Sequence, residues 1–141
     1  MPARRSYNPH PLALSVQRAV KGMGLGLYAG EDIPSNTCLI EYTGRMISKE
    51  EELKSRSRYL FTVSRTKTID GAERSNIARY INHSCDPNAE AVIHKGHIYI
   101  FSIRPIEKGE AITYDYGKEY FDEYLSNGRC RCDSCMQKAP A

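Results

Sequence analysis

Short runs of apolar and β-branched residues, bounded by turn-forming residues, make up most of this chain. Such runs predict strands, because a helix needs a longer stretch with apolar residues three or four positions apart. The pattern therefore predicts a mostly-β domain. The expected strands are Cys38–Tyr42, Arg58–Val63, Thr66–Asp70, the pair Glu90–His94 and His97–Ile103, and Ala111–Tyr116. Lys95 and Gly96, between the members of the pair, are expected to form a hairpin turn.

Two segments favour helical structure. Ser48 followed three positions later by Glu51 forms a capping box, which predicts a short charged helix over Ser48–Arg58. Ser75–Ile81 is expected to form one or two further helical turns. The proline-containing start, Met1–Ala19, looks irregular, with an edge segment as the alternative.

Length, composition and charge narrow the class of protein. A chain of 141 residues with 40% hydrophobic and 26% charged residues suits one soluble globular domain. A net charge of +3 is too mild to indicate direct nucleic-acid binding. We find no apolar run that suits a signal peptide or a membrane span, so we expect an intracellular protein with no membrane partner.

One stretch, Arg79–Asn88, concentrates the polar chemistry of the chain. It reads Arg-Tyr-Ile-Asn-His-Ser-Cys-Asp-Pro-Asn and brings amides, an imidazole, a thiol and a carboxylate around a single Ile. A tight turn needs fewer polar groups, and a buried polar cluster needs partners. This stretch therefore indicates a ligand-binding site rather than a simple hydrogen-bonded turn.

A second candidate is the glycine-rich stretch Gly24–Ala29, which formally matches the dinucleotide-binding pattern G-x-G-x-x-A. That pattern requires a helix after the glycines, and the segment Glu31–Thr37 with its proline is too short to supply one. We interpret the stretch as a strand end whose backbone a ligand can approach.

The five cysteines indicate a metal rather than disulfides, which are uncommon inside cells. Cys130, Cys132 and Cys135 form a tight C-x-C-x-x-C cluster, a spacing typical of metal ligands. Cys38, in an apolar strand, is expected to be a buried core residue.

Four motifs occur in the order found in SET-domain protein lysine methyltransferases, and this chain resembles that family. The motifs are Gly24–Ala29, Glu41–Gly44, Arg79–Asn88 and Tyr114–Gly117, and the cysteine cluster is similar to the family's post-SET zinc segment. The resemblance implies an irregular segment at residues 1–19, a SET domain at 20–117 and a zinc-binding tail at 118–141. It also implies small curved sheets around a knot-like core, in which Ala111–Tyr116 threads the loop Arg79–Cys85.

The family's cofactor is S-adenosylmethionine, and its substrate is a lysine side chain of a protein. By resemblance, the cofactor-binding residues are Gly24, Leu25, Gly26, Tyr59, Arg79, Tyr80, Asn82, His83 and Tyr116. A catalytic His83 is the alternative, since a free imidazole titrates near neutrality.

Three tyrosines match the channel that binds the lysine in this family: Tyr42, Tyr114 and Tyr116. The resemblance assigns Tyr116 to positioning the amine and the transferring methyl group. At Tyr114 the family often tunes how many methyl groups are added, so a tyrosine there favours mono- or dimethylation. Packing in the core is the alternative role for these rings.

The resemblance also implies one zinc ion held by Cys85, Cys130, Cys132 and Cys135, which would clip the tail over the channel. The spacing departs from the family pattern, because only two residues separate the last two cysteines where four are common. This departure leaves the tail conformation open.

Substrate and source are not determined by these motifs. A histone tail or another basic protein is the expected partner, with a nuclear location in a eukaryote or a cytoplasmic one in a bacterium; the oligomeric state is open. Two other classes compete: a non-catalytic SET-fold module that only binds peptides, and a cysteine hydrolase that pairs Cys85 with His83, His94 or His97.

Overall fold

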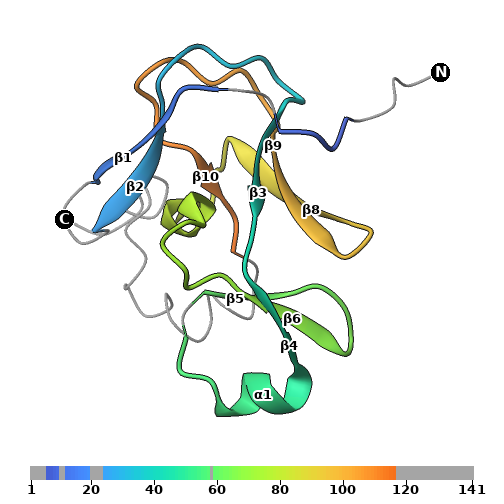
Figure 1. Ribbon diagram of the computed structural model, residues 1–141. Helices are drawn as coiled ribbons and strands as arrows, with labels where there is room; N and C mark the ends of the chain where they lie inside the picture. The colour runs from blue at the N-terminus through green and yellow to red at the C-terminus, as the bar shows by residue number, and fades with distance from the viewer. Residues whose placement is uncertain (1–5, 10–11, 20–23, 58, 117–141) are drawn as a thin grey trace.

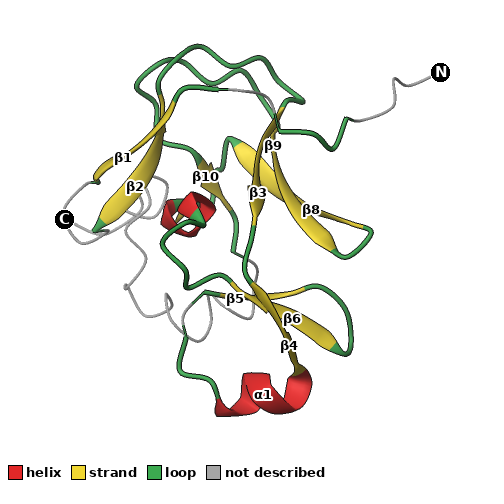
Figure 2. Ribbon diagram, in the orientation of Figure 1, coloured by secondary structure: helices red, strands yellow, loops and turns green. Residues whose placement is uncertain are grey.

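The computed structural model describes residues 6–9, 12–19, 24–57 and 59–116. Within these residues strands predominate and helices are short (Figure 2). The elements in order are β1 (Leu14–Arg18), β2 (Leu25–Ala29), β3 (Cys38–Tyr42), β4 (Arg45–Ser48), α1 (Lys49–Lys54), β5 (Leu60–Thr62), β6 (Lys67–Asp70), the 3-10 turn η1 (Ile77–Tyr80), β7 (Asn82–His83), β8 (Ala89–His94), β9 (His97–Ser102) and β10 (Thr113–Tyr114).

The strands form small separate sheets rather than one large one (Figure 1). Strand β1 pairs with β2, β9 lies between β3 and β8, and β6 lies between β4 and β5, all antiparallel. The short strands β7 and β10 pair in parallel. In Figure 1, β10 runs through the middle of the domain, with α1 and its sheet at one end.

The hairpin between β8 and β9 confirms the turn expected at Lys95 and Gly96. Both residues have positive φ angles, 50° and 81°, which is the conformation that a two-residue hairpin turn requires. The hairpin directs alternate residues of β9, among them Ile98 and Ile100, into the core. Residues from several sheets complete this core: Leu27, Ile33, Leu39, Ile81, Ile106 and Ile112.

The helix is shorter than predicted. Ser48 and Glu51 do form the capping box, but α1 ends at Lys54 instead of continuing to Arg58. None of its residues is buried, so no burial of an apolar face would stabilise a longer helix. In addition, the Ser57 hydroxyl donates to Asp70 Oδ1 at 2.8 Å, which draws the chain towards β6. None of the helices that the structure describes is long and apolar enough to cross a membrane.

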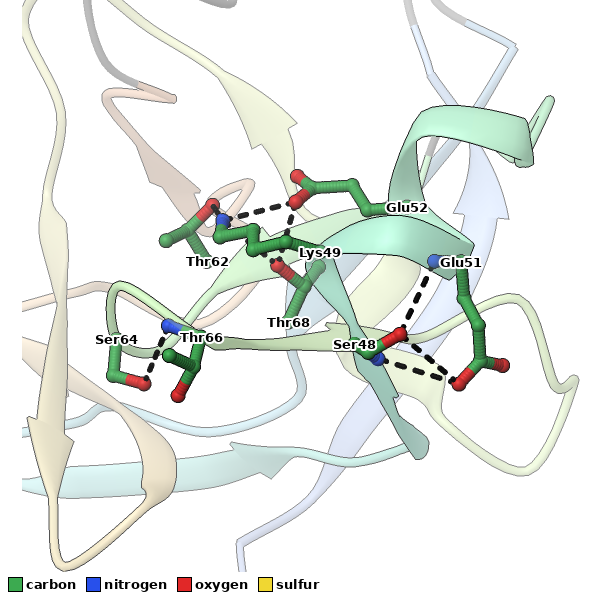
Figure 3. A network of polar contacts seen from close by, with 8 residues as sticks. All are labelled: Ser48, Lys49, Glu51, Glu52, Thr62, Ser64, Thr66 and Thr68. Atoms are coloured by element: carbon green, nitrogen blue, oxygen red, sulfur yellow. Dashed lines mark hydrogen bonds and ion pairs between the residues drawn. The ribbon is translucent and has the colours of Figure 1, made fainter.

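Polar contacts attach α1 to the sheet beneath it (Figure 3). Lys49 Nζ lies 2.9 Å from Glu52 Oε2 and 3.2 Å from Thr68 Oγ1. The hydroxyl of Thr68, a fully buried residue of β6, donates to Glu52 at 3.1 Å. The buried Thr68 hydroxyl, which lies between the charges of Lys49 and Glu52, thus joins α1 to β6.

Besides the two-residue strand β7, the strands β1 and β4 were not predicted. Strand β4 directly continues the path of β3, and β1 lies in the segment expected to be irregular, where it forms the edge of the β1–β2 sheet. Both strands carry polar and exposed residues, so their periodic pattern is weak.

Candidate functional site

The candidate site is built where two distant segments of the chain run in parallel. Strand β7 pairs with β10 so that Asn82 faces Thr113 and His83 faces Tyr114. The Ser84 amide extends the pairing by donating to the Tyr114 carbonyl at 3.2 Å. The motif at Arg79–Asn88 and the motif that begins at Tyr114, both of which carry predicted site residues, are therefore brought together.

Buried Asn88 fixes this pairing from the far side of the turn. Its side-chain nitrogen donates to the Ala111 carbonyl at 2.7 Å and to Glu110 Oε2 at 3.0 Å. Its side-chain oxygen accepts the Thr113 amide at 2.9 Å. The end of the polar stretch thus holds the segment that carries Tyr114 and Tyr116.

Tyr116 is held at both ends. Its amide donates to His83 Nδ1 at 3.0 Å, and its hydroxyl donates a short hydrogen bond to the carbonyl of Ile81. Ile81 directly precedes β7, so the phenol lies across the β7 segment. This arrangement gives the ring little freedom to turn.

The three predicted channel tyrosines form a row together with Phe61, which we call the aromatic row. Ring centroids are 5.4 Å apart from Tyr42 to Phe61, 6.3 Å from Phe61 to Tyr114 and 5.0 Å from Tyr114 to Tyr116. Tyr42 and Tyr114 are buried, whereas Phe61 and Tyr116 are half-buried. The rings are tilted against one another rather than stacked, and aromatic rings gathered in this way attract a cation and exclude water.

Phe61 was missed by the sequence analysis, although it lies in the predicted strand Arg58–Val63. Its place in the row depends on the pairing of β5 with β6 and on the approach of β3, which are contacts between distant parts of the chain. A strand pattern alone identifies an inward-facing aromatic residue but not what it faces.

His83 is buried and neutral. Its Nδ1 atom accepts the Tyr116 amide hydrogen, so the ring proton belongs on Nε2, which lies 3.2 Å from Cys85 Sγ. Burial lowers the pKa of His83 and outweighs Asp115, whose carboxylate, 3.7 Å away, acts in the opposite direction. These contacts favour a binding role for His83 over acid–base catalysis.

The same tautomer weakens the cysteine hydrolase alternative. A base that activates Cys85 needs a lone pair on the nitrogen that faces the thiol. Here the nitrogen that faces the thiol carries the proton, while Nδ1 is already used by the main chain. The contact with His83 therefore does not activate the Cys85 thiol.

The glycine-rich stretch and β7 are joined by one hydrogen bond. Asn82 Nδ2 donates to the Leu25 carbonyl at 3.0 Å, which brings the predicted cofactor residues of both segments together. Gly26 is buried within β2, whereas Gly24 and Leu25 are exposed.

Arg79, another of the predicted cofactor residues, lies against two aromatic rings. Its guanidinium carbon lies 4.3 Å from the centroid of the Tyr59 ring and 5.1 Å from that of Tyr80. One terminal nitrogen donates to the Ala72 carbonyl. Among the residues that the structure describes, its buried Nε atom has no hydrogen-bond partner. A buried donor left in this way indicates a site for a further polar group.

The zinc prediction falls largely outside the described residues. Cys130, Cys132, Cys135 and the predicted tail at 118–141 lie there, and the described part of the chain holds no group of three or more metal-ligating side chains. Cys85 is exposed just after β7. Cys38 is buried as predicted, and burial with the nearby Glu41 charge raises its pKa to about 11.

Comparison with known proteins identifies the class. The family model of the SET domain matches residues 24–117, so the chain belongs to the SET domain family. The mostly-β SET fold predicted from the motifs is thereby confirmed.

Curated relatives are histone-lysine N-methyltransferases. Histone-lysine N-methyltransferase trr of Drosophila melanogaster is 39% identical over 115 residues, which cover 73% of this chain and 5% of that protein. An H3 lysine-4 specific histone-lysine N-methyltransferase of Aspergillus oryzae is 40% identical over 120 residues, 76% of this chain and 10% of that protein. This chain thus spans a tenth or less of the length of these relatives.

A solved structure supports the same fold. A chain of a humanized mutant of the Chaetomium thermophilum Polycomb Repressive Complex 2, bound to the inhibitor GSK126, aligns with a TM-score of 0.69 and 34% identity. The alignment covers 75% of this chain and 15% of that chain.

Proposed function

We propose that this domain transfers methyl groups from S-adenosylmethionine to lysine side chains of a protein substrate. The observation that carries the proposal is the aromatic row, in which Tyr42, Phe61, Tyr114 and Tyr116 follow one another at ring distances of 5.0 to 6.3 Å. Such a row suits the long, cationic side chain of lysine. The histone-lysine methyltransferases among the relatives support the same reaction.

The residues of the predicted cofactor group fit S-adenosylmethionine. The buried Arg79 Nε lacks a partner among the described residues, and the Tyr59 and Tyr80 rings beside it suit a flat base. We infer that Gly24, Leu25 and Gly26 line the cofactor along their backbone, opposite Asn82, His83 and Tyr116. When bound, the cofactor supplies a methyl group on a positively charged sulfur.

The chain's own residues prepare the lysine. A lysine ammonium has a reference pKa near 10.4, so the amine must lose a proton before it can accept a methyl group. The rings attract the cationic side chain, whereas removal of the amine from water disfavours its charged form, and the hydroxyls of the row orient the lone pair. Tyr116 is suited to this positioning because both its amide and its hydroxyl are fixed.

We infer that the product is mono- or dimethyl-lysine. Tyr114 is buried between Phe61 and Tyr116, where its hydroxyl fills space that a further methyl group would need. A phenylalanine at this position would leave that space open. The inference rests on the tyrosine at position 114.

We further propose one zinc ion bound by Cys85, Cys130, Cys132 and Cys135. Four thiols are a common donor set for structural zinc. The exposure of Cys85 beside the two predicted binding residues Asn82 and His83 supports a link between the tail and the site.

The proposed substrate is a histone or another basic protein. The relatives are histone-lysine methyltransferases by name, which supports this substrate class. We accordingly propose a nuclear location if the source is a eukaryote and a cytoplasmic one if it is a bacterium. A SET-fold module that binds peptides without catalysis is the alternative; the fixed geometry of Tyr116 favours the enzyme.

The test is methyl transfer from labelled S-adenosylmethionine to purified core histones and to a ribosomal protein mixture, with wild type and Tyr116→Phe compared. We expect label on lysine that falls about a hundredfold or more in the variant. Tight cofactor binding without label would point to a different substrate class. If the protein neither bound the cofactor nor transferred label, the proposed reaction would be contradicted and the peptide-binding module would be favoured.

A further inference from the structure

A node of main-chain and side-chain contacts holds Tyr42 at the start of the aromatic row. The Tyr42 hydroxyl donates to the Tyr59 carbonyl at 2.8 Å, and the Gly71 amide donates to the same oxygen, also at 2.8 Å. The carbonyl of Tyr59, a residue of the predicted cofactor group, thus accepts one hydrogen bond from the Tyr42 hydroxyl and one from the amide of Gly71, which directly follows β6.

Gly71 lies directly against the Tyr42 ring. A methyl group in the Cβ position of residue 71 would lie 2.4 Å from Tyr42 Cε1 and 2.6 Å from Cζ. Carbon atoms cannot approach so closely, so the ring occupies space that any other residue at position 71 would need. The contact involves the edge of the ring that carries the hydroxyl.

Asn76 closes the node from the other side. Its Nδ2 atom donates to the Gly71 carbonyl at 3.0 Å, and its Oδ1 atom accepts the amide of Thr43, the neighbour of Tyr42, at 3.1 Å. Asn76 is buried, and the same Cβ at position 71 would lie 2.5 Å from its Nδ2. Moving either the Tyr42 ring or the Asn76 side-chain amide away from residue 71 would break a hydrogen bond.

We propose that Gly71 is a positioning and specificity-determining residue of this domain, which acts through Tyr42. The missing side chain lets the Tyr42 ring lie against the main chain and keeps its hydroxyl on the Tyr59 carbonyl. That contact sets the width of the aromatic row at Tyr42 and the direction of the hydroxyl's lone pairs. The inference rests on the proposed lysine methylation and adds the residue that fixes one wall of its channel.

The test is a double-mutant cycle of Gly71→Ala and Tyr42→Phe, with purified core histones as substrate. We expect Gly71→Ala to lower kcat for the first methyl transfer at least tenfold and to change the ratio of mono- to dimethyl-lysine. The dissociation constant of S-adenosylmethionine, measured by calorimetry, should change less than threefold. If Gly71 acts through the Tyr42 hydroxyl, the double variant should be no more than threefold slower than Gly71→Ala alone.

Gly30→Ala is the matched control. A Cβ at Gly30 would lie 2.8 Å from the Ala13 carbonyl oxygen, at the end of the β1–β2 sheet, so this variant is crowded in a similar way elsewhere. Its kcat and product ratio should stay within threefold of wild type. An equal change in Gly30→Ala would show that crowding in general, rather than Tyr42, causes the effect.

Asn76→Asp serves if Gly71→Ala does not fold. It keeps the oxygen that accepts the Thr43 amide and removes the donor to the Gly71 carbonyl, so it should give the same shift in product ratio. Combining it with Tyr42→Phe should again slow the reaction no further than threefold. The inference, but not the proposed function, would be overturned if the wild type were active and these variants gave unchanged products. It would also be overturned if the rate effects of the position-71 or position-76 variant and of Tyr42→Phe multiplied in the double variant. A wild type that transfers no methyl group would overturn the proposed function and the inference with it.

Discussion

The Tyr116 hydroxyl donates a hydrogen bond to the main-chain carbonyl of Ile81, thirty-five residues earlier in the chain. This bond crosses the parallel pair of β7 and β10 and ties the proposed catalytic tyrosine to the start of the strand that carries Asn82 and His83. The phenol is thus oriented by the main chain of this domain rather than by a ligand. A group fixed in advance loses little freedom when the substrate binds.

Asn82→Ala tests the link between β7 and the glycine-rich stretch. The variant removes the 3.0 Å hydrogen bond from Nδ2 to the Leu25 carbonyl. A lost hydrogen bond of this kind costs about 1 kcal/mol, so we expect the dissociation constant of S-adenosylmethionine to rise about fivefold. Calorimetry measures it directly.

Gln17→Ala is the control for this variant. Its side-chain amide donates to Ser15 Oγ at 2.7 Å on the exposed strand β1. Gln17 pairs with Gly26 of β2, so this variant removes a neighbouring polar side chain but keeps the hydrogen bond from Asn82 to the Leu25 carbonyl. Cofactor affinity should remain at the wild-type level. Equal weakening in both variants would contradict the role given to Asn82.

Much of the fold was predictable because most strands carry their own local signals. The hairpin at Lys95 and Gly96 was predicted from its turn residues, and the capping box at Ser48 marked the start of α1. The end of α1 was wrong because the bond from Ser57 to Asp70 is a tertiary contact. Strand β1 carries too few apolar residues to be recognised alone.

The site shows the same division between local and distant information. Asn82, His83, Tyr114 and Tyr116 lie in linear motifs, and the pairing of β7 with β10 brings those motifs together. Phe61 belongs to the aromatic row only because β3, β5 and β10 meet, and no motif encodes that meeting. Contacts between segments far apart in sequence decide which residues complete the site.

Tyr114→Phe should raise the number of methyl groups added. The ring stays buried in the aromatic row, but the hydroxyl no longer fills the space that a second or third methyl group needs. We expect the trimethylated fraction after a long reaction to increase several-fold, as measured by mass spectrometry of the product. Tyr99→Phe, on the β3–β9–β8 sheet, should leave the product distribution unchanged. Chiefly trimethyl-lysine from wild type would refute the assignment.

Zinc content tests the proposed tail clip without reference to activity. We expect about one zinc ion per chain in the purified protein, and much less in Cys85→Ser, because three remaining thiols bind more weakly. Cys38→Ala should keep its zinc, since Cys38 is buried in β3. Metal analysis by mass spectrometry provides the measurement. Equal zinc in wild type and Cys85→Ser would remove Cys85 from the ligand set.

Alkylation tests the burial of Cys38. The thiolate is the reactive form, and the pKa of Cys38 is raised to about 11, so almost none of it is ionised at pH 8. Iodoacetamide should therefore leave Cys38 unmodified in the native protein and modify it after denaturation. Its native reaction rate should rise with pH up to about 11. Peptide mass spectrometry after brief labelling at pH 8 would contradict the burial if Cys38 reacted at once.

Thr68→Val tests whether polar contacts hold α1 on its sheet. The fully buried Thr68 hydroxyl donates to Glu52 at 3.1 Å and lies 3.2 Å from Lys49 Nζ. Valine keeps the shape of the side chain but leaves both charged groups without this partner, which should lower the free energy of unfolding by about 1 to 2 kcal/mol. Thr66→Val is the control, because Thr66 is exposed in the turn between β5 and β6. Urea denaturation followed by circular dichroism gives both values. A loss no larger than that of Thr66→Val would contradict the role given to the buried hydroxyl, because the ion pair between Lys49 and Glu52 lies within α1 and does not join it to β6.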